Sequence, residues 1–175
     1  SIPYQVTIHH PPVMMKKATF DAVGGYRDFI CAQDYDLWLR MWYAGAKMKN
    51  MHVALLQYRI REDSITSQKR FLQKLTTDYI KELFWQRLQS GADSYSYTSY
   101  NDYLKQHGAY DSKKNNNFLK EHAMLVKANS LIEKGSVFVG LLMRLKVFLV
   151  SESYRRSYTG KLKTKIMVKK YLCSK

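Results

Sequence analysis

The chain has 175 residues and carries 29 Lys and Arg residues against 14 Asp and Glu residues, a formal net charge of +15 at pH 7. This length fits one domain, or one domain with an appendage, and an apolar content of 46% excludes a disordered chain. Cys31 and Cys173 lie far apart with no second Cys or His at ligand spacing, which argues against a disulfide framework and a zinc site.

The ends of the chain suggest a piece of a longer protein. The first residues have neither the basic region nor the apolar region of a signal peptide, and there is no initiator Met. No apolar run approaches the roughly 20 residues that a transmembrane helix needs.

Residues 1–66 predict a small α/β region. Residues 13–15 have the composition of a short buried strand, and a helix over 16–23 is expected to end at Gly24 and Gly25. The strongest helix signal begins at Asp34, which we expect to be its N-cap. Its apolar stripe ends near Gly45 and consists of Leu37, Trp38, Met41 and Trp42. A second strand is expected over 51–58.

Residues 67–175 predict mostly helix. A long helix is expected over 66–90, ended by Gly91, and then a loop over 93–110 with one helical turn at 100–106. The polar stretch 113–117 predicts a break, and further helices are expected over 118–133, 136–150 and 161–172.

Asp34 and Asp36 are paired carboxylates at the start of the Trp-rich helix. One interpretation is a general base, because a carboxylate at this position can accept a proton from a substrate hydroxyl. The other is structural: Asp34 caps the helix and Asp36 complements its dipole. Spacing alone favours the structural interpretation.

Three other groups of residues allow two interpretations each. Gly24, Gly25 and Tyr26 could form a backbone platform for a ligand, or only a helix end and turn. Arg59 and Arg61 alternate at a strand end, where they could clamp phosphates or pair with neighbouring acids. The doubled His9 and His10 precede two prolines, and are more typical of a loop than of a metal site.

The excess charge lies mainly in the last forty residues. The net charge is +2 over 1–66, +4 over 67–135 and +9 over 136–175. Basic residues there follow a long apolar stretch, which favours an anionic membrane surface over nucleic acid as the partner of residues 136–175.

Residues 10–66 together resemble family 2 glycosyltransferases of the GT-A fold. Five segments carry the resemblance, in the order that is typical of the family: His10-Pro11-Pro12-Val13-Met14-Met15-Lys16-Lys17, Val23-Gly24-Gly25-Tyr26, Ala32-Gln33-Asp34-Tyr35-Asp36-Leu37-Trp38-Leu39-Arg40, Leu55-Leu56-Gln57-Tyr58-Arg59-Ile60 and Ser64-Ile65-Thr66. Each segment is a weak signal alone, but five in order within about sixty residues are much stronger.

The resemblance implies a fold and roles. It implies a partial GT-A-like, Rossmann-like α/β half over 1–66, on the acceptor side, with a helical extension over 67–175. Asp34 would be the catalytic base for inverting attack on the sugar C1. Substrate-binding residues would be His10, Gly24, Gly25, Tyr26, Asp36, Arg59 and Arg61, with Arg59 near the diphosphate.

The chain also departs from the family pattern. Gln33 stands where Glu usually precedes the base, Arg61 stands where His is usual, and Pro12 stands where Thr or Ser is more usual. The nucleotide-binding half with its Asp-x-Asp motif would lie upstream, so the ligands of the expected Mg or Mn ion are not in this chain. We therefore expect the chain alone to be inactive.

The expected function is transfer of a sugar from a nucleotide-sugar donor to a glycan or lipid-linked acceptor in bacterial surface polysaccharide synthesis. We expect a cytoplasmic location, peripheral at the inner face of the cell membrane. A non-catalytic helical interaction module on a degenerate transferase remnant is the alternative, and a basic nucleic-acid binder ranks last.

Overall fold

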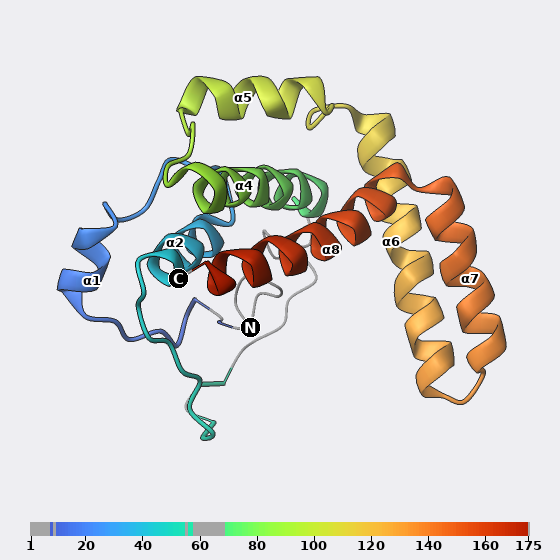
Figure 1. Cartoon of the computed structure of the whole chain (residues 1–175). Coiled ribbons are helices and arrows are strands. Elements are labelled where there is room, and N and C mark those ends of the chain that lie inside the picture. Colours follow the sequence, from blue (N-terminus) through green and yellow to red (C-terminus); the bar gives the residue numbers. More distant parts are fainter. Residues whose placement is uncertain (1–7, 9, 55, 58–68, 175) are drawn as a thin grey trace.

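The computed structural model describes residues 8, 10–54, 56–57 and 69–174. Within these residues the chain forms seven helices, which Figure 1 labels. They are α1 (Lys17–Ala22), α2 (Gln33–Tyr43), α4 (Arg70–Ser90), α5 (Tyr97–Gln106), α6 (Ser112–Glu133), α7 (Val137–Val150) and α8 (Glu152–Cys173).

The predicted α/β fold, a partial GT-A-like and Rossmann-like half, is wrong for the part of the chain that the structure describes, which is helical and contains no strand. Residues 13–15 are irregular, and so is the described part of the expected strand over 51–58. Val53 is 62% exposed. Strand-prone residues form a strand only where a neighbouring strand takes up their backbone hydrogen bonds, and no described segment does so here.

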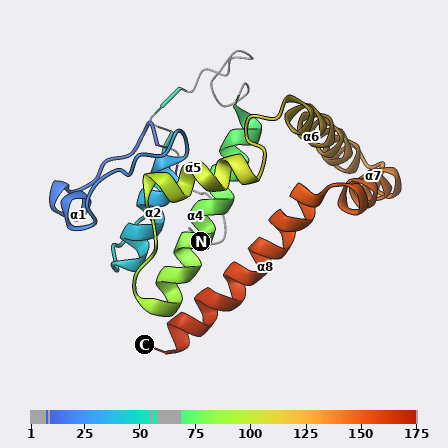
Figure 2. The same ribbon diagram turned by 90° about the horizontal axis from the view of Figure 1, so that it is seen from above.

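Helix α4 is the central element of the fold. It contacts α2, α5, α6 and α8; Figure 1 shows it between α5 and α8, and in Figure 2 α5 crosses over it. The buried core therefore joins residues from both sides of the predicted domain boundary at 66 and 67. Its members include Leu37, Trp38, Ile80, Leu83, Tyr100, Leu104 and Val168. The boundary itself lies outside the described residues, and the division into two domains stays a prediction.

The helix expected from Asp34 is present as α2, but its start differs from the prediction. Ala32 is the N-cap, in the left-handed conformation with φ of 58°, and the helix begins at Gln33. Asp34 is therefore a first-turn residue, and its carboxylate faces the positive end of the helix dipole without capping the helix.

Three helices are longer than the sequence predicted, because a polar side chain caps each one. Ser96 Oγ accepts a hydrogen bond from the Ser99 amide at 3.0 Å, so the expected loop contains the full helix α5. Asp111 accepts from two amides at the start of α6, where a break at 113–117 was predicted. Ser151 Oγ accepts from the Tyr154 amide at 3.1 Å, which starts α8 well before residue 161.

Helix α8 packs back onto α4 through small residues. Gly160, Thr164 and Val168 recur at every fourth position and are buried. The Trp85 indole Nε1 of α4 donates a hydrogen bond to Thr164 Oγ1 at 3.0 Å. The C-terminal helix thus covers a core helix that lies about eighty positions earlier in the chain.

Helices α6 and α7 form a hairpin that projects from the body of the molecule (Figures 1 and 2). A close approach between the two helices occurs at Gly140, where a Cβ atom would lie 2.7 Å from the Ala128 carbonyl oxygen. Within the described residues, none of the helices combines the length and the apolarity needed to cross a bilayer.

This close approach predicts that Gly140→Ala lowers the free energy of unfolding by about 1–2 kcal/mol. The added methyl group overpacks the hairpin by more than the gain in helix propensity. Gly160→Ala is the matched control, because the nearest atom to its added Cβ is a Trp85 ring carbon at an ordinary 3.6 Å. Urea unfolding followed by circular dichroism should show a loss only for Gly140→Ala, and equal effects would contradict the packing described.

Candidate functional site

A cavity of about 540 Å³ lies where the loop after α1 meets the start of α2. It is lined by both polar and aromatic side chains: His10, Tyr26, Arg27, Asp28, Phe29, Gln33 and Asp34. Three of these, His10, Tyr26 and Asp34, were predicted from the sequence as site residues, although 24 positions separate the first from the last.

Asp34 presents a carboxylate to this cavity from the first turn of α2. One of its oxygens, Oδ1, accepts a hydrogen bond from the Tyr35 amide at 2.8 Å, which fixes the carboxyl group at the helix start. The side chain is half-buried, and no ion pair to it is found among the described residues. The helix N-terminus favours negative charge at this position.

His10 and Tyr26 form a second polar feature of the cavity. His10 Nε2 and Tyr26 Oη are 2.6 Å apart, a hydrogen bond between segments that are 16 positions apart. Burial and the nearby Asp34 charge raise the pKa of Tyr26. The phenol therefore keeps its proton at neutral pH and can act as a hydrogen-bond donor at the cavity.

Gly24 and Gly25 shape the turn that delivers Tyr26 to the cavity. Their φ angles are 75° and 64°, in the region where L side chains are strained. A Cβ on Gly25 would also lie 3.0 Å from the Phe20 ring. Neither glycine lines the cavity, so the structure gives them a backbone role there, and their predicted contact with substrate stays a prediction.

Asp36 lies behind the cavity and is buried with Arg40. Arg40 Nη2 is 2.7 Å from Asp36 Oδ2, and the same guanidinium donates to the carbonyl oxygens of Val23 and Gly25. Burial raises the pKa of Asp36, and the Arg40 and Arg27 charges oppose that rise. This pair ties the glycine turn to α2, and the predicted substrate contact of Asp36 stays a prediction.

A row of alternating charges continues from this pair toward α4. Arg27 Nη1 is 3.5 Å from Asp36 Oδ1, and Arg27 Nη2 is 3.0 Å from Asp93 Oδ1. Arg87 Nε, near the end of α4, donates to Asp93 Oδ2 at 3.0 Å. We call Arg40, Asp36, Arg27, Asp93 and Arg87 the buried charge row. It links the loop beside the cavity to the central helix.

Arg59 and Arg61, the expected diphosphate contacts, lie outside the described residues. The sequence did not single out Arg27, Asp28 or Phe29 as site residues, although all three line the cavity. These three residues directly follow Gly24-Gly25-Tyr26, and this position could have predicted them. A turn that places Tyr26 at the cavity also places the next residues there.

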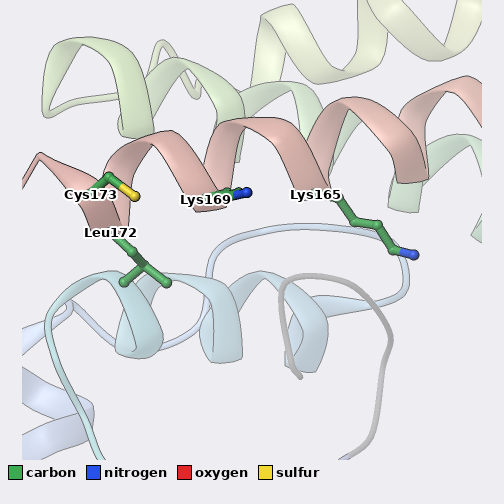
Figure 3. Close-up of a pocket in the computed structure, with 4 residues that line it drawn as sticks. All are labelled: Lys165, Lys169, Leu172 and Cys173. Carbon is green, nitrogen blue, oxygen red and sulfur yellow. The ribbon is translucent and has the colours of Figure 1, made fainter.

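A second cavity, of about 380 Å³, lies along α8 and is lined by Lys165, Lys169, Leu172 and Cys173. Figure 3 shows Leu172 pointing from α8 toward α2, while Lys165 extends away from α8. The described residues that line this cavity include no carboxylate or imidazole that could move a proton, so the cavity at Asp34 is the better candidate for catalysis.

The described residues do not fit a metal ion. No group of three or more His, Cys, Asp or Glu side chains within them is placed to hold one.

The comparisons with family models, curated proteins and solved structures find no match to this chain. The resemblance to family 2 glycosyltransferases therefore depends on the motifs of residues 10–66 alone.

The buried charge row predicts that Arg40→Met destabilises the protein by about 3–5 kcal/mol, because Asp36 loses its closest partner while it stays buried. Lys17→Met is the matched control. It breaks the Lys17–Asp21 pair, which has the same four-residue spacing but is exposed at the surface, and should cost less than about 1 kcal/mol. Equal losses in urea unfolding would contradict the role of the row.

The row also predicts a dependence on pH. Burial acts to raise the pKa of Asp93, but hydrogen bonds from Arg27 and Arg87 outweigh it and hold that pKa below its ordinary value. A depressed pKa in the folded state gives stability that is present above the ordinary pKa of Asp and is lost as the pH falls from there through the lowered folded-state pKa. Asp93→Asn should therefore be less stable than the parent at pH 7 and lose less stability on acidification to pH 3. Unfolding curves of the two proteins with identical pH dependence would refute this.

Proposed function

We propose that the chain supplies the acceptor side of an inverting glycosyltransferase, with Asp34 as the general base. The observation that carries this proposal is the cavity in which Asp34 lies together with His10 and Tyr26. All three belong to the motifs that resemble family 2 glycosyltransferases. The proposal concerns the activity and the site, and it does not depend on the α/β fold that the described residues lack.

In the proposed reaction, an acceptor hydroxyl enters the cavity and gives its proton to an Asp34 carboxylate oxygen. The hydroxyl oxygen attacks C1 of the donor sugar as the bond from C1 to the nucleotide diphosphate breaks. The bonding electrons leave with the diphosphate, and the configuration at C1 inverts. This route needs a base and no covalent intermediate on the protein.

The other cavity residues suit the binding of a sugar hydroxyl. The Tyr26 phenol and the His10 ring can exchange hydrogen bonds with hydroxyl groups, and Phe29 offers an apolar surface. The side-chain amide of Gln33 donates a hydrogen bond to the Phe29 carbonyl oxygen at 2.7 Å. A neutral residue is thus held beside Asp34, and it adds no second negative charge next to the base.

The donor and the location are part of the same proposal. The donor is a nucleotide sugar, and the acceptor is a glycan or a lipid-linked glycan in surface polysaccharide synthesis. Arg59 is expected to contact the diphosphate, and the Mg or Mn ion of the complete enzyme would be held outside this chain. The proposed location is peripheral, at the inner face of the cell membrane.

One structural observation bears on the alternative of a non-catalytic helical module. That alternative expects Asp34 to pack against the core, away from any cleft. Asp34 lines a cavity instead, while Asp36 is the carboxylate that faces the interior. This arrangement supports the catalytic proposal over the module.

The test is Asp34→Asn in the full-length protein, with Asp28→Asn as the matched control in the same cavity. Loss of the base should reduce turnover by about 10²–10⁴-fold and leave donor affinity nearly unchanged. Asp28→Asn should retain turnover within a few-fold of the parent. Unchanged turnover in Asp34→Asn, or a larger loss in Asp28→Asn, would refute Asp34 as the base.

A further inference from the structure

Helix α7 is apolar on most of its circumference and remains largely uncovered. Its 14 residues include two charged residues, Arg144 and Lys146, and no residue with a polar uncharged side chain. Gly140 and Val147 are its buried positions, and they face α6. Eight of its large apolar side chains are about half exposed or more: Val137, Phe138, Val139, Leu141, Leu142, Leu145, Leu149 and Val150.

Four of these exposed side chains form a continuous stripe on the face that points away from α6. Phe138, Leu142, Leu145 and Leu149 follow a spacing of four, three and four residues, which places them on one side of a helix. At 100° per residue this side lies opposite Gly140 and Val147. Phe138, at the hairpin end of α7, is 75% exposed. Because the hairpin projects from the body (Figure 1), the stripe lies at the outer edge of the molecule.

The charges of this region identify a complementary partner. The same helical geometry places Lys146 about 70° to one side of the centre of the stripe and Arg144 about 130° to the other side, toward α6, and both are exposed. Residues 136–175 contain ten basic residues and one acidic residue, Glu152. An apolar stripe flanked by cations fits a bilayer surface with anionic headgroups, where long basic side chains reach the phosphates while the apolar stripe enters the acyl region.

A second copy of the chain fits this face less well. Packing α7 against α7 would bring Arg144 and Lys146 of two copies together with no carboxylate on the helix to pair with them. The stripe also spans only two heptads, whereas a coiled coil is typically indicated by three or four. At about 1.5 Å per residue, α7 is about 21 Å long, which is too short to cross a bilayer and suits a helix that lies in its interface.

We propose that the outward face of α7 inserts into the interface of an anionic lipid bilayer, with the α6–α7 hairpin as the membrane-binding element. Phe138, Leu142, Leu145 and Leu149 enter the acyl boundary, while Arg144 and Lys146 contact headgroup phosphates. The tight Gly140–Ala128 contact holds α7 against α6 so that the stripe faces outward. This inference names the surface that would hold the protein at the proposed membrane location. It does not depend on sugar transfer.

The first experiment locates the inserted residue. In Phe138→Trp, an indole replaces the most exposed ring of the stripe, and in the control Leu162→Trp it replaces a residue of α8 that is 54% exposed. Each protein is mixed with vesicles of phosphatidylcholine and phosphatidylglycerol, with and without brominated acyl chains. Phe138→Trp should show a blue shift and strong quenching by bromine beyond that of the parent tryptophans, and Leu162→Trp should not.

The second experiment measures the contribution of the stripe to binding. Leu142→Ser with Leu145→Ser should weaken co-sedimentation with the mixed vesicles by roughly tenfold or more, because two large side chains no longer enter the bilayer. Leu162→Ser with Ile166→Ser, a pair of similar exposure on α8, should bind within about threefold of the parent. Circular dichroism confirms that both variants are folded.

The outcomes distinguish membrane binding through α7 from membrane binding through α8 and from dimerisation through α7. Parent binding should require phosphatidylglycerol and fall as salt is added, because salt screens the basic side chains. Loss of binding only in the α8 variant, equal binding of all variants, or no binding by the parent would overturn the proposal. So would a parent dimer that light scattering shows to be broken by the α7 variant in the absence of vesicles. None of these readouts measures sugar transfer, so failure here leaves the role of Asp34 open to its own test.

Discussion

The alternating row of buried charges from Arg87 to Arg40 is the interaction on which the candidate site depends. Each charge in the row is largely removed from water, so each one needs an opposite charge beside it. Arg87 belongs to the central helix, Arg27 to the loop beside the cavity and Arg40 to α2, so the row fixes these three elements relative to each other. Because Arg40 also binds the carbonyl oxygens of the glycine turn, the position of Tyr26 follows from the same row.

The row also explains why two carboxylates two positions apart can have different roles. A helix turns by about 200° over two residues, so Asp34 and Asp36 point in nearly opposite directions. Asp36 forms ion pairs with Arg27 and Arg40. Asp34 lies at the cavity, and among the described residues no cation forms an ion pair with it. A structural acid and a candidate base thus arise from one short segment, and the membrane-binding surface proposed for α7 lies on a separate hairpin.

The helices were predicted from the sequence more accurately than the fold was. The stripe of Leu37, Trp38, Met41 and Trp42 correctly indicated α2, although the structure buries every residue from 35 to 41 and therefore all sides of this part of the helix. The expected strand over 51–58 was wrong in its described part, because strand formation depends on a neighbouring strand that local composition cannot supply. The motif residues His10, Tyr26 and Asp34 line one cavity in the structure, while their predicted roles in catalysis and substrate binding stay predictions. The contact of Arg27 with Asp93, 66 positions away, has no local signal, since either residue alone is typical of a solvated surface.

The packing of α8 on α4 has a consequence for the order of events during synthesis. Val168 belongs to the same core as Ile80 and Leu83, and Trp85 finds its hydrogen-bond partner only at Thr164. While the ribosome synthesises the residues between α4 and α8, this side of α4 is exposed. Its apolar side chains can then form non-native contacts. Contacts between positions so distant in sequence also slow folding. The core around α4 is therefore completed only when α8 has emerged and packs over α4.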